Sequence, residues 1–180
     1  MKVTRDRKLR WTIPIILFFS IIFDSALPAV FPREFVGDSQ HIVSHMMLLW
    51  VVAFAFYFKD QDILWYSLLF GVIAELYNGT IVGVYMTCYW LIAFCVLRLK
   101  RYLPKYAMVY FMLLLLSIVL LDTLIFIFYH EVGLTTVTLS HYVVDNLVPT
   151  MIFNTVLYFV MYFPMRSVLT WLGYEKHYIV

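Results

Sequence analysis

The chain has 180 residues, 64% of them hydrophobic and only 13% charged, with a formal net charge of +2. Soluble domains usually carry about 25% charged residues, and a small fold leaves much of its surface exposed, so this composition excludes an ordinary water-soluble domain. We expect an all-α integral membrane protein that forms one domain over residues 1–180, with a lipid bilayer around it and no nucleic-acid partner.

Six apolar segments, separated by polar or proline-containing breaks, predict six transmembrane helices with short loops. The first follows a basic stretch, but it lacks a small-residue cleavage site and leads into further apolar segments. We therefore interpret it as an uncleaved span rather than a signal peptide. The predicted spans are residues 11–30, 42–58, 63–77, 81–97, 106–129 and 143–163.

The third and fourth spans are short, because residues 63–97 are fewer than two full spans and a turn require. Either this hairpin is thin and deforms the bilayer, or its Asn78-Gly79 turn lies below the outer surface and is shielded by protein.

The basic residues predict the orientation. With both termini in the cytoplasm, the cytoplasmic pieces hold every Lys and Arg of the 13 except Arg33. Short cytoplasmic loops carry this excess of positive charge in multi-pass membrane proteins. We therefore expect a multi-pass protein of the plasma membrane with a cytoplasmic N-terminus.

Acidic residues inside the apolar segments are the first candidates for function. Asp24, Glu75 and Asp122 interrupt uncharged runs, and Asp145 begins the last one. A charged side chain at a helix centre costs at least about 2.5–3.5 kcal/mol, so such groups usually face protein or water. From the helical rise, Asp24 and Glu75 lie roughly 18–20 Å and Asp122 about 24 Å from the cytoplasmic side. We infer an acidic, outward-facing cavity, with Arg33 as a candidate counter-charge.

Structural roles for these acids remain open. Asp145 could cap a helix whose first turn contains Pro149. Asp24 and Asp122 could reach interfacial water, or be protonated and hydrogen-bonded between helices. Two functional roles also remain open for them, namely contact with a partner protein and a path for an ion or solute.

Small residues surround one of the acids. Gly71, Glu75 and Gly79 are four apart and share a helix face, and Gly83 continues the spacing beyond the turn. Glycines let a second backbone approach closely. This face fits either a tight hairpin within the chain or a docking surface for another protein's helix.

Residues for metal or catalytic chemistry are sparse. His41 and His45 have the i, i+4 spacing that can place two imidazoles on one ion, but the sequence marks no third ligand. No catalytic triad and no phosphate-binding glycine loop appears. We expect no cofactor, no metal and no enzymatic activity.

Two segments resemble the MreD family of rod shape-determining proteins. Residues 66–85 resemble its central signature, in which a glycine precedes an acid by four residues and a polar turn and second glycine follow. Residues 145–154, with a proline and a following asparagine, resemble its closing segment.

The resemblance implies a non-enzymatic membrane scaffold of the bacterial cell-elongation machinery, which makes peptidoglycan. Such a protein is expected to bind a single-span MreC-like partner and to connect MreB-type cytoskeleton with peptidoglycan synthases. Our candidate partner-binding residues are Glu75, Gly71, Gly79, Gly83, Asp24, Asp122 and Asp145.

Two competing functions also fit parts of the sequence. The substrate-binding subunit of an energy-coupling-factor vitamin transporter also has about six spans and an outward-facing pocket, although Ser25 and Ala29 form only a poor small-residue coupling face. A membrane-embedded enzyme fits less well, because it generally needs paired acids or histidine clusters at matched depth.

Overall fold

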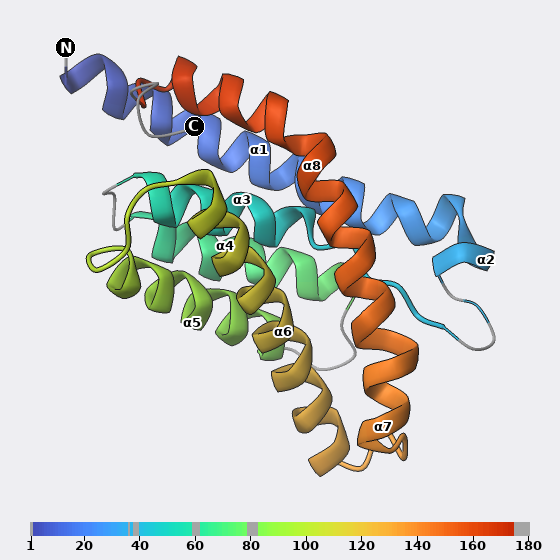
Figure 1. Cartoon of the computed structure of the whole chain (residues 1–180). Helices are drawn as coiled ribbons and strands as arrows, with labels where there is room; N and C mark the ends of the chain where they lie inside the picture. The colour runs from blue at the N-terminus through green and yellow to red at the C-terminus, as the bar shows by residue number, and fades with distance from the viewer. Residues whose placement is uncertain (1, 36, 38–39, 59–61, 79–82, 175–180) are drawn as a thin grey trace.

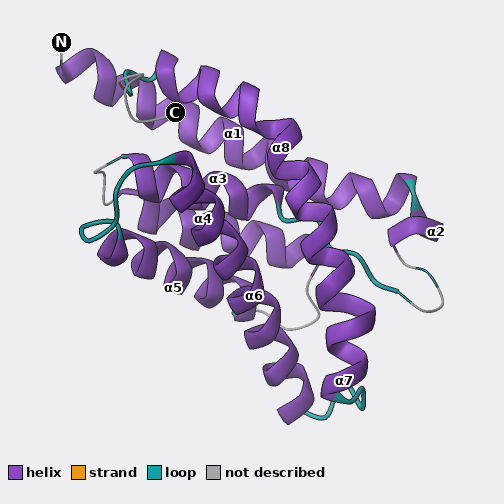
Figure 2. Cartoon of the chain, in the orientation of Figure 1, coloured by secondary structure: helices purple, strands orange, loops and turns teal. Residues whose placement is uncertain are grey.

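The computed structural model describes residues 2–35, 37, 40–58, 62–78 and 83–174. Within these residues the chain is helical and has no β-strand, as predicted (Figures 1 and 2). The elements are α1 (Lys2–Val30), α2 (Pro32–Phe35), α3 (Met46–Tyr57), α4 (Asp62–Asn78), α5 (Val84–Leu99), α6 (Ala107–Glu131), α7 (Leu139–His141), the π-helical turn η1 (Tyr142–Leu147) and α8 (Val148–Trp171).

Three helical stretches are long and apolar enough to cross a membrane. They are residues 8–30, 107–131 and 139–171. Helices α3 and α5 are apolar but have only 12 and 16 residues. At about 1.5 Å per residue they are shorter than a hydrocarbon core of about 30 Å.

The six main helices alternate in direction (Figure 1). Helix α1 begins and α8 ends side by side at one end of the molecule, where the Lys8 ammonium lies 4.8 Å from the centre of the Trp171 ring. The connection from α5 to α6 lies at this same end, which we call the terminal end. Helices α2 and α7 lie at the opposite end, which we call the far end.

Helix α3 forms the centre of the fold, since all twelve of its residues are buried. It packs against α1, α4, α5, α6 and α8. Large apolar side chains are instead exposed on the outer helices, for example Phe19 on α1, Leu116 on α6 and Phe159 on α8. An apolar outer surface suits lipid rather than water as the surrounding solvent.

The predicted second span, residues 42–58, differs from the structure at its beginning. Helix α3 starts at Met46, and residues 41–45 precede it without helical structure. The apolar pattern could not reveal this break, because what holds these residues out of a helix is contact with side chains far away in the sequence. The backbone N–H groups of Val43 and His45, for example, bind side chains of α8. Those contacts form the most polar region of the interior.

Candidate functional site

The non-helical segment 41–45 is held by the first turns of α8 and by η1. The Val43 N–H donates to the Thr150 hydroxyl (3.1 Å), and the His45 N–H donates to the Asn154 side-chain oxygen (2.9 Å). The Asn154 amide also donates to the Val43 and Thr150 carbonyls, at 2.7 and 2.8 Å. Thr150 and Asn154 are four residues apart, so both side chains lie on one face of α8.

Proline explains a further contact of this segment. In a regular helix the Asp145 carbonyl would accept a bond from the backbone N–H of residue 149, but Pro149 has none. The His41 N–H donates to the Asp145 carbonyl instead, at 3.0 Å. The wide η1 turn stands immediately before this proline.

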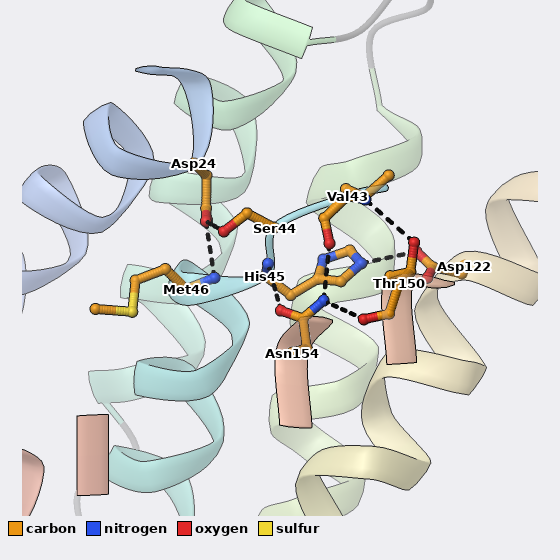
Figure 3. A network of polar contacts seen from close by, with 8 residues as sticks. All are labelled: Asp24, Val43, Ser44, His45, Met46, Asp122, Thr150 and Asn154. Carbon is orange, nitrogen blue, oxygen red and sulfur yellow. Dashed lines mark hydrogen bonds and ion pairs between the residues drawn. The ribbon is translucent and has the colours of Figure 1, made fainter. Parts of the chain in front are cut away.

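Asp24 of α1 caps the beginning of α3. Its carboxylate accepts hydrogen bonds from the Ser44 hydroxyl (2.5 Å) and the Met46 backbone N–H (2.8 Å) (Figure 3). It also accepts one from the Met47 backbone N–H (2.9 Å). The first N–H groups of a helix have no partner within it and carry partial positive charge. A carboxylate from another helix supplies both the acceptors and the complementary charge.

The opposite end of α3 has a basic partner. The Lys100 ammonium donates to the Ala55 carbonyl at 2.7 Å and to the Phe58 carbonyl. The last carbonyls of a helix also lack partners within it and favour a cation. Asp24 and Lys100 therefore complement the two ends of a short buried helix.

His45 connects this network to α6. Its Nε2 lies 2.9 Å from an Asp122 carboxylate oxygen, and both side chains are largely buried (Figure 3). His41 lies on the exposed part of the segment and His45 on its buried part, and the segment is not helical, so the helical basis of their i, i+4 spacing is absent. Among the described residues no group of three potential metal ligands occurs.

Two pockets flank segment 41–45. One has a volume of about 230 Å³ and includes Asp24, His41 and Tyr89 in its lining. The other, which we call the far-end pocket, has a volume of about 470 Å³. Its walls come from segment 41–45, α5, α6, the loop after α6, η1 and α8, and they include Val43, Tyr85, Asp122, Phe126, Tyr142 and Thr150.

The structure corrects the prediction of one cavity shared by the four acids. Asp24 and Asp122 line different pockets, while Glu75 and Asp145 line neither of these two. Asp24 has Ser44 and backbone N–H groups as its hydrogen-bond partners, and no described ion pair joins it to Arg33.

Glu75 and Gly71 lie within the α4–α5 hairpin. Glu75 is 1% exposed, and its carboxylate accepts a hydrogen bond from the Tyr85 N–H (3.1 Å) in the first turn of α5. A Cβ on Gly71 would lie 2.8 Å from the Met86 Cα, so the two helices approach most closely where only glycine fits. Of the two uses predicted for this face, the structure displays the tight intramolecular hairpin.

The other two glycines differ from the predicted pattern. Gly83 precedes α5 with φ +115°, and a Cβ there would meet no atom within 4 Å, so the position needs glycine for its backbone and not for close packing. Gly79 lies outside the described residues.

Asp145 pairs with a histidine. It lies within η1, and one of its carboxylate oxygens is 3.3 Å from His141 Nδ1, four residues earlier. The predicted N-terminal cap at Asp145 is therefore wrong, because residues 139–147 extend the helical stretch in front of α8.

Sequence reasoning gave no role to Ser44, Thr150 and Lys100, and it noted Asn154 only as part of the family resemblance. Thr150 and Asn154 could have been found as polar residues four apart in an apolar helix. Lys100 gave no such signal, because it lies among other basic residues that the topology explains.

The described network holds backbone in place. Each hydrogen bond or ion pair in Figure 3 joins segment 41–45 or the first turn of α3 to another helix, or joins two residues within α8. Non-helical backbone at membrane depth is tolerated where protein satisfies its polar groups.

A buried central helix, an internal polar network and an apolar outer surface are the features of a helical membrane protein. The family model of the rod shape-determining protein MreD matches residues 5–171, so the chain belongs to the MreD family. It is similar to the rod shape-determining protein MreD of Bacillus subtilis (strain 168), with 19% identity over 157 residues, which are 87% of this chain and 91% of that protein. No solved structure matches. Membership supports a role in determining rod shape.

Proposed function

We propose that this chain is a non-enzymatic, multi-pass scaffold of the bacterial plasma membrane that binds a single-span MreC-like protein within the cell-elongation machinery. The observation that supports this most is membership of the MreD family over residues 5–171. Through that partner the chain connects an MreB-type cytoskeleton with peptidoglycan synthases. The vitamin-transporter function gains no support from the comparisons.

The proposed topology has six membrane crossings, with the terminal end in the cytoplasm. The alternating direction of the six main helices supports it (Figure 1). The distribution of charge supports it as well, because Arg98 in the last turn of α5 and three lysines and arginines of the α5–α6 connection (Lys100, Arg101 and Lys105) lie at the terminal end. Helix α3 is short, so segment 41–45 in front of it would lie below the outer surface.

We assign the partner contact to the far-end pocket. Asp122 lines it, and Asn146, the neighbour of Asp145, contributes to the opposite wall. Phe126 and Tyr142 stack with ring centres 4.1 Å apart, and they give the pocket an aromatic wall. A volume of about 470 Å³ suits anchoring side chains from the near-membrane segment of the partner.

Other candidate residues support the walls of this pocket without lining it themselves. Gly71 and Glu75 set the distance between α4 and α5, and Glu75 binds the backbone of Tyr85, whose side chain lines the pocket. Asp24 fixes the beginning of α3 on the other side of segment 41–45. Gly83 precedes α5 as a turn residue, and Gly79 stays a candidate partner-binding residue.

Co-purification of the full chain with its single-span partner tests this assignment. Val43 is 43% exposed and lines both this pocket and the smaller one beside it, so Val43→Trp would narrow the far-end pocket, whereas Val144, 64% exposed on η1, lines neither. We expect Val43→Trp to lower the recovered partner at least about tenfold, as the loss of one anchoring contact can. Val144→Trp serves as the matched control and should leave recovery unchanged.

Equal recovery of the partner with both tryptophan variants would overturn the pocket assignment. Failure of the wild-type chain to recover any single-span partner from its own membranes would overturn the scaffold function itself. Gel filtration of each variant in detergent establishes that the chain remains folded.

A further inference from the structure

A second polar region lies at the terminal end, away from the network around His45. A pocket of about 470 Å³ there is lined by Leu64 of α4, by Phe94, Leu97 and Arg98 of α5, and by Lys100, Arg101 and Lys105 of the following connection. Four of its seven lining residues are cationic, and none of these seven described residues is acidic. This pocket shares no lining residue with the far-end pocket.

The cations of this pocket have different tasks within the fold. Lys100 binds the carbonyls at the end of α3, and the Lys105 ammonium lies 5.4 Å from the centre of the Tyr174 ring. The Arg98 guanidinium lies 5.1 Å from the centre of the Phe94 ring, at the wall of the pocket, and both Arg98 and Arg101 are exposed. The two exposed arginines can therefore bind a ligand while Lys100 and Lys105 keep their contacts within the protein.

The walls indicate the class of ligand. Guanidinium groups match the geometry of phosphate oxygens. Leu64, Phe94 and Leu97 provide apolar surface beside them, at the junction between apolar helices and a basic connection. A ligand with a phosphate next to hydrocarbon fits both parts, and basic pockets between helices on the cytoplasmic side are sites for anionic lipid headgroups.

We propose that this basic pocket binds the phosphate headgroup of an anionic phospholipid, with Arg98 and Arg101 on the phosphate and Phe94 and Leu97 beside the glycerol and the first acyl carbons. A bound lipid would fix the connection between α5 and α6 against the beginning of α4. It would also hold the terminal end of the scaffold at the anionic surface of the cytoplasmic leaflet.

Native mass spectrometry of the full chain in detergent tests the proposal. The probes are phosphatidylglycerol, phosphatidylcholine with the same acyl chains, and glycerol 3-phosphate as a soluble phosphate. We expect phosphatidylglycerol to bind at least about tenfold more tightly than phosphatidylcholine, and Arg98→Gln with Arg101→Gln to weaken it by roughly tenfold or more, since each cation near anionic lipid contributes about 1 kcal/mol.

The control variant removes the same two charges elsewhere, as Arg33→Gln with Arg166→Gln, and should bind phosphatidylglycerol as the wild-type chain does. Equal affinity for the two lipids would overturn the proposal, as would full phosphatidylglycerol binding by the Arg98/Arg101 variant. Displacement of the lipid by glycerol 3-phosphate at matched concentration would also overturn it, because the ligand would then be a soluble phosphate.

Discussion

Three charged residues of this chain, Asp24, Glu75 and Lys100, bind backbone groups at helix ends. Asp24 lies at the beginning and Lys100 at the end of the buried helix α3, each bonded to groups that the helix leaves unpaired. Glu75 does the same for the first turn of α5. In a lipid environment no water is available to bond the unpaired N–H and C=O groups at a helix end. These side-chain contacts therefore permit a short helix to lie in the centre of the fold.

Asp24→Ala should lower thermal stability strongly. It leaves two buried N–H groups at the start of α3 without acceptors, at about 1–3 kcal/mol for each group. Asp24→Asn keeps one acceptor oxygen and should lose less. Thermal unfolding in detergent measures the difference, with Glu34→Ala on the exposed α2 as the control. Equal midpoints for Asp24→Ala and Glu34→Ala would refute the capping role.

The His45–Asp122 pair predicts non-additive effects. Removing one partner leaves the other buried without its ion-pair contact. His45→Gln and Asp122→Asn should each destabilise the chain, and the double variant should lose clearly less than the two single losses together, by about 1 kcal/mol or more. A double-mutant cycle from thermal unfolding measures this coupling, and strict additivity would contradict it.

The sequence revealed the buried acids but not their bonds. Asp24, Glu75 and Asp122 were recognisable because a carboxylate in an apolar run is costly. Their partners were not, because which backbone groups lack an acceptor depends on where α3 and α5 begin. The His45–Asn154 contact, for example, joins residues 109 positions apart.

At the scale of elements, α4 and α5 pack closely at Gly71. Gly71→Ala places a methyl carbon 2.8 Å from the Met86 Cα, a backbone atom that cannot rotate away. We expect a loss of roughly 1–3 kcal/mol from forcing the helices apart. Leu69→Ala is the control, because Leu69 is 54% exposed on the same helix. Thermal unfolding in detergent measures the stability of the two variants. An unfolding midpoint of Gly71→Ala at or above that of Leu69→Ala would contradict close packing at Gly71.

Hydrophobic pattern predicted the six main helices and the short central hairpin. It placed the beginning of α3 four residues early, because Ile42 and Val43 are apolar although they lie in a non-helical segment. It began the last helix too late, at residue 143, because the residues before it are polar. The polar stretch before Val143 looks like a loop, yet residues 139–147 are helical and lead into α8.

At the scale of the whole molecule, the proposed topology can be measured by labelling. In a chain whose Cys88 and Cys95 are replaced by alanine, Thr136→Cys at the far end should react with a membrane-impermeant maleimide added to intact cells. Arg101→Cys at the terminal end should react only after the membrane is opened. Both positions are exposed in the fold. The reverse pattern would contradict the proposed orientation.

Photo-crosslinking in living cells tests the central claim most directly, namely that the far-end pocket receives a single-span partner. A photoreactive phenylalanine analogue is placed at Val43 in the pocket, and as a control at Leu69 on the exposed face of α4. We predict a covalent product with the single-span partner from position 43 and none from position 69. A product from position 69 with none from position 43 would contradict the account.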